Sequence, residues 1–384
     1  MKTYFITTYG CHKTYFITTY GCQLNVHESE KLAGVLKQRG FLPADKLENA
    51  DLIVYNTCAI REGAEDRAFG NVGSLKKLKK ANKDKIIAVC GCMTQQKAKA
   101  EYLYKTFPFI DIIFGTSNLH KFEEFLDKKS KRLLAYDEDF NLKSENMPFY
   151  RTSGENAWVN IMQGCNNFCT YCIVPYVRGR ERSRKSADII KEVKEAIKDG
   201  YKIITLLGQN VNSYGKDCGE MSFAELLKTI ANLDGDFKIA FMTSHPKDLT
   251  SDVIDVIAQN DKLLKEIHLP VQSGSNKILE KMNRKYTIEK YLDIIEEIKA
   301  KIPNVRITTD IIVGFPGETD EDFEATCNLV KKVKYDGIFA FMYSVREGTV
   351  AEKMPDQVPD EIKNVRVNKI LALEKEIKKG KTNE

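Results

Sequence analysis

The stretch GCNNFCTYC at residues 164–172 carries the strongest signal in this sequence. Its cysteines, Cys165, Cys169 and Cys172, have the spacing C-x3-C-x2-C, and no fourth ligand lies near them in the sequence. Three thiolates on one short loop can each bind one iron of a [4Fe-4S] cluster. The fourth iron of such a cluster has no protein ligand, so a small molecule can bind there.

Zinc and a disulfide are the alternative uses of these cysteines. A structural zinc site needs four ligands, usually arranged as two pairs, and the sequence has no second pair at a suitable spacing. Disulfides are typical of secreted proteins, and nothing in the sequence marks this chain as secreted. The spacing therefore favours an iron–sulfur cluster.

Length and composition indicate a cytoplasmic globular protein with two or three domains. The chain has 384 residues, of which 42% are hydrophobic, so a sizeable core can be buried. It has no apolar run long enough to cross a membrane, and its N-terminus has Thr and Tyr where a signal peptide would be apolar. Its ten cysteines are then expected to stay reduced and free to bind metal. The net charge of +5 permits an acidic partner such as RNA without requiring one.

The N-terminus contains a direct repeat, because KTYFITTYGC at 2–11 recurs at 13–22. The second copy continues into an expected amphipathic helix, whereas the first copy does not. We therefore interpret residues 1–12 as a duplicated extension. On this interpretation Cys22 is the functional cysteine and Cys11 is not.

Residues 13–127 alternate between expected strands and helices, which indicates an α/β domain with a parallel sheet. The strands are expected at 15–18, 52–55, 86–89 and 111–114. A cysteine follows each of the first three: Cys22, Cys58 and Cys92. Because ligands bind at the carboxyl ends of strands in open α/β sheets, we expect these cysteines to converge. The alternative, a buried structural thiol, fits Cys90, which lies within the third strand.

Residues 128–156 are polar and are expected to form a linker, and a second α/β series occupies residues 157–384. Its strands are expected at 157–162, 202–207, 237–242, 265–269, 305–312 and 337–342. Six β/α units in a row predict a partial (β/α)6 TIM-like barrel. Chemistry in such barrels lies at the carboxyl ends of the strands, and the 164–172 loop follows the first strand.

Polar, glycine-rich segments follow other strands of this barrel: GQN at 208–210, TSHP at 243–246, LPVQSGS at 269–275 and GFPGE at 314–318. Glycines at strand ends allow the backbone to approach a ligand. The expected cofactor-binding residues in these segments are Gly208, Gln209, Asn210, Ser244, Gln272, Ser273, Gly314, Pro316 and Gly317. His245 and His268 could equally be core histidines, and Cys218 and Cys327 are expected to be ordinary residues.

Two segments are basic. The lysines at 76–85 are expected to form a solvated helix face, which is the usual role of a charge run, and contact with RNA is the less favoured alternative. The segment RGRERSRK at 178–185 directly follows the cysteine loop. Its arginines could be solvated or ion-paired, or could bind an anionic ligand or RNA. The candidate RNA-binding residues are Arg178, Arg180, Arg182 and Arg184.

Taken together, the chain resembles the radical S-adenosylmethionine (SAM) methylthiotransferases. The loop of the radical SAM superfamily has the pattern C-x3-C-x-aromatic-C, with Tyr171 at the aromatic position, and Tyr171 is therefore also an expected cofactor-binding residue. The other matching segments include TTYGCQLN at 18–25, NTCAIRE at 56–62, GCMTQ at 91–95, GQNVNSYG at 208–215, MNRKYT at 282–287 and DIIVGFPGET at 310–319. The resemblance covers nearly the whole chain from Lys13.

The resemblance implies an N-terminal methylthiotransferase domain, a radical SAM barrel and an RNA-binding TRAM domain. The sequence stops at Glu384, about where the TRAM domain is expected to begin. The resemblance also implies two [4Fe-4S] clusters, one held by Cys165, Cys169 and Cys172 and cleaving SAM, the other held by Cys22, Cys58 and Cys92. The implied reaction adds a methylthio group to C2 of N(6)-dimethylallyladenosine next to the anticodon of tRNA.

The implied partners are a tRNA substrate, a reductant such as flavodoxin or ferredoxin, and a sulfur donor, and the protein is expected to be a monomer. One alternative is a sister enzyme that acts on threonylcarbamoyl-adenosine in tRNA or on a ribosomal-protein aspartate. The segments NTCAIRE and GQNVNSYG argue against it. The other alternative is a non-enzymatic iron–sulfur carrier. A carrier needs the thiolates but no SAM pocket, so the GQN and GFPGE loops argue against it.

Overall fold

The computed structural model describes residues 12–59, 62–128, 132–152 and 154–382. The chain divides into two compact units, residues 1–152 and residues 153–384. The first repeat copy at 2–11, which includes Cys11, lies outside the described residues. None of the described helices is both long enough and apolar enough to cross a lipid bilayer.

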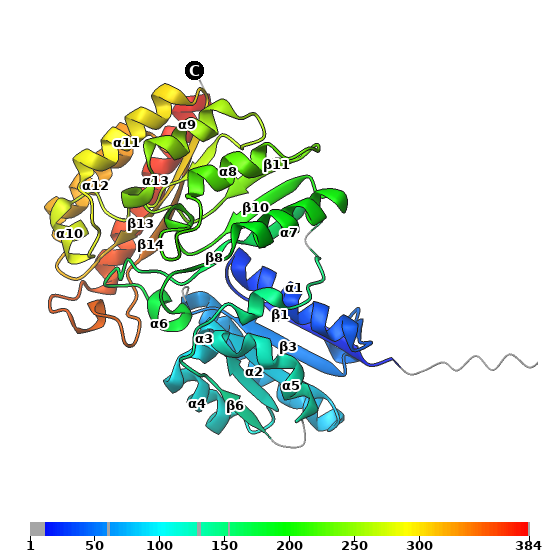
Figure 1. Cartoon of the computed structure of the whole chain (residues 1–384). Coiled ribbons are helices and arrows are strands. Elements are labelled where there is room, and N and C mark those ends of the chain that lie inside the picture. The colour runs from blue at the N-terminus through cyan, green and yellow to red at the C-terminus, as the bar shows by residue number, and fades with distance from the viewer. Residues whose placement is uncertain (1–11, 60–61, 129–131, 153, 383–384) are drawn as a thin grey trace, which may run out of the picture. The chain divides into compact units, whose positions relative to one another are not determined.

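The first unit is built on a parallel sheet of six strands (Figure 1). The strands are β1 (Thr14–Thr19), β2 (Leu42–Pro43), β3 (Leu52–Thr57), β4 (Ile86–Gly91), β5 (Ile112–Gly115) and β6 (Leu133–Ala135). Their order in the sheet is β2-β1-β3-β4-β5-β6, and every pairing is parallel. The expected α/β sheet is therefore confirmed. The carboxyl ends of β1, β3 and β4 are neighbours at one edge.

Helices cover both faces of this sheet. Apolar residues of α1 (Gln23–Gln38) and α5 (Phe122–Asp127) pack on one face, and those of α2 (Glu62–Ala81) and α4 (Lys97–Thr106) pack on the other. The two faces alternate along each strand, as in Leu52 and Val54 against Ile53 and Tyr55. The shorter helices of the unit are α3 (Cys92–Gln95), η1 (Leu47–Asn49), η2 (Thr116–Lys121) and η3 (Lys143–Asn146).

Part of the segment expected to be a linker, residues 128–156, belongs to this unit. Its residues 133–135 form β6, which pairs with β5. A later part packs on α1, where the buried Lys31 forms an ion pair of 2.7 Å with Glu145. A three-residue strand in a polar context has too few residues to show an alternating pattern, so the sequence does not reveal it.

The second unit contains six strands that lie in sequence order, which confirms the expected partial barrel. They are β7 (Asn156–Asn160), β10 (Ile203–Leu207), β11 (Lys238–Phe241), β12 (Glu266–His268), β13 (Arg306–Val313) and β14 (Gly337–Met342). The strands pair in parallel as β7-β10-β11 and as β12-β13-β14. A parallel bridge between Ile239 and Leu263 joins the two groups.

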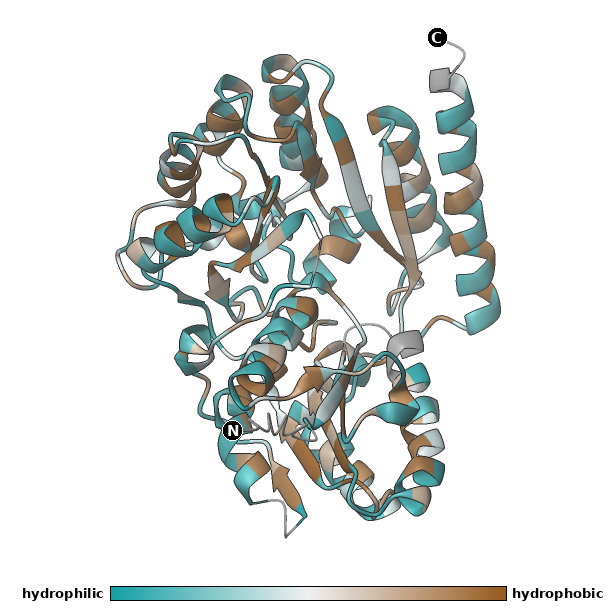
Figure 2. Cartoon of the chain, turned by 90° about the vertical axis from the view of Figure 1, so that its right-hand side faces the viewer, coloured by the Kyte–Doolittle hydropathy of each residue, from teal (hydrophilic) through white to brown (hydrophobic). Residues whose placement is uncertain are grey.

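Helices cover the outer face of this barrel sheet. Ala157, Val159, Ile204 and Leu206 are fully buried in one core with apolar residues of α7 (Ser186–Lys198). Figure 2 shows apolar residues concentrated on the strands. The remaining helices are α6 (Val174–Arg178), α8 (Phe223–Ala231), α9 (Ser251–Gln259), α10 (Asn276–Lys281), α11 (Ile288–Lys301), α12 (Asp320–Val333), α13 (Asp360–Thr382), η4 (Val211–Ser213), η5 (Pro246–Asp248) and η6 (Ala351–Lys353).

Candidate functional site

The cysteine loop lies between β8 (Met162–Gln163) and α6, and an antiparallel pairing of β8 with β9 (Arg182–Ser183) closes its base. Gly164 has φ +80°, and a Cβ atom there would lie 1.9 Å from the carbonyl oxygen of Arg180. Only glycine fits this approach. The loop is therefore anchored immediately before Cys165, whose N–H donates to the carbonyl oxygen of Gly179 over 3.1 Å.

Hydrogen-bond donors point at the sulfur atoms of this loop. The backbone N–H and the side-chain amide of Asn167 each lie 3.5 Å from Sγ of Cys165. Nη1 of Arg284 lies 3.5 Å from Sγ of Cys169. Donors to sulfur stabilise thiolates and are a feature of iron–sulfur sites.

Burial raises the pKa of Cys165 to about 11, and Cys169 adds to this effect, although Asn167 opposes it. Burial and the neighbouring Cys169 also raise the pKa of the Cys172 thiol well above its ordinary value. The three thiols are thus close enough to influence one another. The raised pKa values of Cys165 and Cys172 favour the protonated thiols, and a bound cation that replaces the protons would favour the thiolates.

These residues fit an iron–sulfur cluster. Within the described ranges no three His, Cys, Asp or Glu side chains are grouped to hold one metal ion. A [4Fe-4S] cluster does not need such a group, because each of its thiolates binds a different iron. Three cysteines on one loop, with N–H donors aimed at their sulfur atoms, match that requirement.

Tyr171, within this loop, belongs to a small aromatic cluster. Its ring makes an edge contact with Phe315, with 6.4 Å between ring centroids, and Phe315 makes another with Tyr343 at 5.4 Å. Phe168, in the same loop, has φ +46°, which is unusual for a bulky residue. Such strain is typical of functional loops.

The GQN segment supports the cysteine loop. Oε1 of Gln209 accepts a hydrogen bond from N–H of Gly164. Position 208 favours glycine, because a Cβ atom there would lie 2.7 Å from Cγ of Met162. The side-chain amide of Asn210 donates to Asp248 over 2.8 Å. The first two residues therefore hold the loop, and Asn210 connects this strand end to the next.

Asp248 was not anticipated from the sequence. Its side chain is 4% exposed and is paired with Lys216 and Lys247, each at 2.8 Å. Burial alone would raise the pKa of Asp248. Hydrogen bonds from Lys216, Lys247 and Asn210 outweigh the effect of burial and lower the pKa to about 2. A charged Asp248 therefore fixes the loops that follow β10 and β11.

Polar side chains at three strand ends have buried atoms without a hydrogen-bond partner in the described structure. They belong to Asn210, Asn212, Ser244, His245 and Gln272. Buried polar groups are normally satisfied, so such a concentration indicates groups that a polar ligand would satisfy. Two residues in the same loops, Thr243 and Gln272, have φ values of +74° and +71°. Strained backbone beside unsatisfied polar groups is typical of a binding site.

His245 is a neutral donor in this group. Burial lowers its pKa to about 2, and the nearby Arg284 adds to this effect. Its Nδ1 accepts from N–H of Lys247 over 3.2 Å, so the ring proton lies on Nε2. That Nε2 atom is buried and has no partner in the described structure.

The other expected cofactor-binding residues have structural contacts. Oγ of Ser273 accepts a hydrogen bond from N–H of Ser275.

The GFPGE loop contacts α13. N–H of Gly314 donates to Glu318 over 2.6 Å, and Glu318 forms a buried ion pair of 2.7 Å with Arg366 of α13. Burial raises the pKa of Glu318 to about 6, although Gly314 and Arg366 oppose it. Pro316 is buried and Gly317 has φ +75°. The GFPGE loop is therefore fixed to α13.

The four arginines of the 178–185 segment differ in exposure. Arg178 and Arg184 are buried, and Arg184 forms an ion pair of 2.8 Å with Glu192. Arg182 donates to the carbonyl oxygen of Arg178 over 2.8 Å. Arg180 is exposed, and its guanidinium lies 4.1 Å from the centroid of the Phe168 ring. Arg180 is thus the arginine of this segment best placed to meet an anion from solvent.

Cys22, Cys58 and Cys92 follow the adjacent parallel strands β1, β3 and β4 in the first unit. Cys58 and Cys92 are buried, and Cys22 is half-buried. A Cβ atom at Gly21 would lie 2.6 Å from Cβ of Cys58, so the segment before Cys22 lies directly on Cys58. The strand ends thus bring all three cysteines to one edge of the sheet.

A buried amide pair, which has no signal in the sequence, holds this edge. Asn25 donates to the carbonyl oxygen of Thr57 over 3.0 Å, and Asn56 donates to the carbonyl oxygen of Asn25 over 2.8 Å. Sγ of Cys22 lies 3.4 Å from Oδ1 of Asn25. Cys90, by contrast, lies within β4 in the apolar core, where burial raises its pKa.

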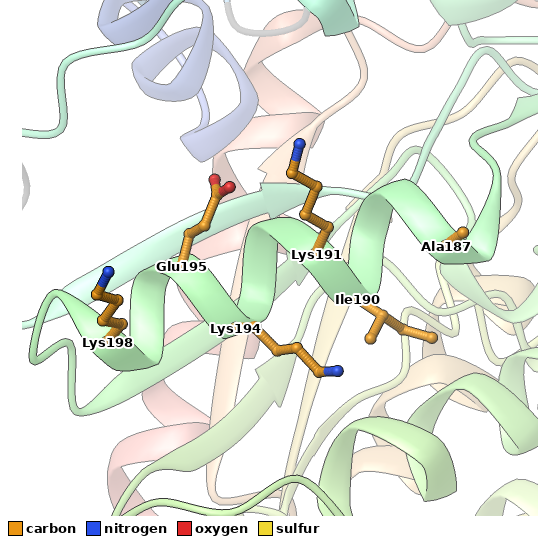
Figure 3. A pocket seen from close by; sticks show the side chains of 6 residues that line it. All are labelled: Ala187, Ile190, Lys191, Lys194, Glu195 and Lys198. Carbon is orange, nitrogen blue, oxygen red and sulfur yellow. The ribbon is translucent and has the colours of Figure 1, made fainter.

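Two further cysteines and one surface depression lie apart from these features. Cys218 is exposed, and Cys327 is buried in α12. Figure 3 shows a depression of about 470 Å³ along α7. It is lined by Ala187, Ile190, Lys191, Lys194, Glu195 and Lys198. Its lining comes from one outer helix and includes neither a cysteine nor an unsatisfied polar atom, so it is not a candidate for the chemistry.

Comparisons with known proteins identify the family of this chain. Residues 159–330 match the Radical SAM superfamily, and residues 14–115 match the Uncharacterized protein family UPF0004. A tRNA-2-methylthio-N(6)-dimethylallyladenosine synthase of Clostridium botulinum is 57% identical, over 99% of this chain and 84% of that protein. A protein of the same name from Carboxydothermus hydrogenoformans is 53% identical, over 97% of this chain and 83% of that protein.

Solved structures share the fold. The radical SAM methyltransferase TsrM from Kitasatospora setae superimposes with a TM-score of 0.66 at 13% identity, over 88% of this chain and 75% of that chain. The cobalamin-dependent radical SAM enzyme OxsB gives a TM-score of 0.59 at 13% identity, over 95% of this chain and 56% of that chain. Because residues 159–330 match the Radical SAM superfamily and the chain is 57% and 53% identical to the two synthases over most of their length, the chain belongs to the radical SAM tRNA-2-methylthio-N(6)-dimethylallyladenosine synthase family.

Proposed function

We propose that this protein adds a methylthio group to C2 of N(6)-dimethylallyladenosine next to the anticodon of tRNA. The observation that carries this proposal is the cysteine loop, with N–H donors aimed at two of its sulfur atoms, in a chain 57% identical to a synthase of that name. A carrier protein is disfavoured because the unsatisfied polar atoms beside the loop need a second ligand.

Cys165, Cys169 and Cys172 would hold one [4Fe-4S] cluster. Together with SAM, such a cluster supplies the radical that removes a hydrogen atom from the substrate carbon. The residues of the chain hold and orient these groups. Asn167 and Arg284 would stabilise the thiolates, and Gln209 fixes the loop through Gly164. The chemistry belongs to the cofactors, and the protein positions them.

The unsatisfied atoms at the strand ends would bind SAM. SAM carries an ammonium, a carboxylate and an adenosine, which need both donors and acceptors. Nε2–H of the neutral His245 can donate, and Oε1 of Gln272 can accept. Ser244, Asn210 and Asn212 add groups that can act in either role.

Cys22, Cys58 and Cys92 would hold the second [4Fe-4S] cluster, on the first unit. Three cysteines at adjacent parallel strand ends support this assignment, and Gly21 gives the first of these segments room beside Cys58. An iron without a protein ligand at this site would be free to bind the sulfur that the reaction transfers.

The proposed reaction also requires partners. It needs an electron from a reductant such as flavodoxin or ferredoxin, and a sulfur donor. We further propose that the protein acts as a monomer in the cytoplasm, where tRNA is found. The exposed Arg180 would contact a tRNA phosphate.

The test is a reaction under anaerobic conditions with reconstituted protein, SAM, a reductant and tRNA, followed by mass analysis of the nucleosides. One tRNA carries N(6)-dimethylallyladenosine and another carries threonylcarbamoyl-adenosine. We expect a methylthio group only on the first. Modification of only the second would support the sister activity, and SAM cleavage without modification of either would reject both substrates.

A further inference from the structure

The inner face of the barrel sheet carries two exposed phenylalanines. Phe339 and Phe341 of β14 are 53% and 37% exposed, and they are the only exposed phenylalanines among the described residues. The alternate residues of β14, Ile338 and Ala340, belong to the core or pack against it. Helix α13, the last helix before the mark C in Figure 2, contacts β14. The two rings therefore point away from the helical layer.

The strand register places polar side chains on the same face. In parallel strands paired residues point to the same side, and Asp310 pairs with Phe339 while His268 pairs with Thr308. The His268 ring makes an edge contact with Phe339 at 5.8 Å between centroids. Nδ1 of His268 lies 3.0 Å from Oγ1 of Thr308, and Nε2 lies 3.5 Å from Asp310. An aromatic surface at Phe339 therefore lies beside the hydrogen-bonding side chains of His268 and Asp310.

This face continues to the cysteine loop. Ile312 pairs with Phe341, so it points to the same side. Ile312 and Tyr171 both pack against the cluster that contains Phe315 and Tyr343. A group bound on the inner face would therefore extend toward the loop that we propose to be the radical site.

We infer that this inner face binds the modified base of the tRNA substrate. On this inference Phe339 and Phe341 contact the adenine ring and its dimethylallyl group, and His268 and Asp310 contact the polar edge of the base. The inference rests on the proposed function. A dimethylallyl adenine needs an apolar surface for its tail and hydrogen-bonding groups for its ring, and both are present here. Unpaired bases are recognised in this way, by stacking on aromatic side chains together with contacts to the base edge.

The inference concerns specificity, so the test compares two RNAs. One is an anticodon stem–loop with N(6)-dimethylallyladenosine next to the anticodon, and the other is the same RNA with adenosine. Affinities are measured for the cluster-loaded protein, for Phe339→Ala and for Phe341→Ala. The matched control is Val365→Ala, because Val365 is an exposed apolar residue of α13, at 69% exposure.

We expect the wild-type protein to bind the dimethylallyl RNA at least about fivefold more tightly than the unmodified RNA, a ratio at the low end of base–aromatic contacts. Each phenylalanine variant should lose most of this preference, because its affinity for the dimethylallyl RNA should fall more than its affinity for the unmodified RNA, while its iron content stays the same. Val365→Ala should behave as wild type. Phe339→Leu and Phe341→Leu, which keep an apolar side chain, should keep part of the preference and serve if an alanine variant loses iron.

Two results would overturn the inference: a wild-type protein with no preference, or phenylalanine variants with the full preference. These results are separable from failure of the proposed function. If the wild-type protein modifies the dimethylallyl RNA while the variants keep their preference, only the inference fails. If the wild-type protein modifies neither RNA but binds one selectively, the proposed activity fails and the binding face remains.

Discussion

Nη1 of Arg284 lies 3.5 Å from Sγ of Cys169, although 115 residues separate them in the sequence. The side chain is 8% exposed, and its other groups donate to the carbonyl oxygen of Pro270 over 2.9 Å and to the hydroxyl of Tyr286 over 3.1 Å. These two contacts fix the guanidinium. The arginine thus holds a positive charge and an N–H donor against a cysteine proposed to bind iron.

Arg284→Gln should lower the reduction potential of the barrel cluster. Positive charge and hydrogen bonds to the sulfur atoms make an iron–sulfur cluster easier to reduce, and the substitution removes the charge. The measurement is a redox titration followed by electron paramagnetic resonance. Arg306→Gln is the control, because Arg306 is 62% exposed and pairs with Glu266. An unchanged potential in Arg284→Gln with full iron content would show that the contact has only a packing role.

Alanine substitution of Cys165, Cys169 or Cys172 should abolish SAM cleavage. Each variant should also lose about four irons per chain, the content of one cluster. The measurements are iron analysis and the yield of 5′-deoxyadenosine. Cys327→Ala is the control, because Cys327 is buried in α12 of the same unit. Formation of 5′-deoxyadenosine at the wild-type rate in any loop variant would contradict the assignment.

Cys58→Ala should separate the two proposed clusters. It should keep SAM cleavage, because the barrel cysteines are intact, and it should lose methylthio transfer together with about four irons. Cys90→Ala is the matched control, since Cys90 is also buried in the first unit but lies within β4. If Cys90→Ala loses iron and Cys92→Ala does not, the choice of thiol at this strand end is wrong.

The sequence predicts the barrel and the strand-end loops because both have local signals. The strands are short apolar segments separated by periodic helices, and glycine follows β10 and β13 directly. The positions of Cys22, Cys58 and Cys92 follow from the same pattern. The order of neighbouring parallel strands then determines which loops meet.

Three residues of the site have no local signal in the sequence and were therefore not predicted: Arg284, Asp248 and Asn25. Each is a single polar residue whose role depends on a partner in another element, as in the 38-residue separation of Asn210 and Asp248. Charge patterning also could not distinguish Arg184, which is buried against Glu192, from the exposed Arg180. Burial of a polar side chain is a property of the tertiary structure.

His245→Gln should make the free energy of unfolding less dependent on pH under acidic conditions. The buried ring has a pKa lowered to about 2, so the folded protein does not take up its proton when the unfolded chain does, below about pH 6.5. The free energy of unfolding therefore falls as the pH decreases below that value, by up to about 1.4 kcal/mol per pH unit from this residue. Urea denaturation of the apo protein between pH 6.5 and pH 5 measures it. Equal pH slopes for the wild type and His245→Gln would contradict the assignment of a neutral buried ring.

Two glycines of the first unit provide a test of the N-terminal cysteine site that leaves every cysteine in place. Gly21 has φ +121°, and a Cβ atom there would lie 2.6 Å from Cβ of Cys58. Gly40 has φ +78°, but nothing lies within 4 Å of an added Cβ atom. Alanine at either position introduces backbone strain of about 1 kcal/mol or more, which lowers the free energy of unfolding in both variants.

Only Gly21→Ala should displace Cys58. We therefore expect Gly21→Ala to lose about four irons and methylthio transfer while it keeps SAM cleavage. Gly40→Ala should keep all of its iron despite its own loss of stability. Because the two variants share the strain and differ in the contact, their difference in iron content reports the close approach of the Gly21 segment to Cys58. Equal iron content in the two variants would mean that the position of Cys58 does not govern iron binding in this unit.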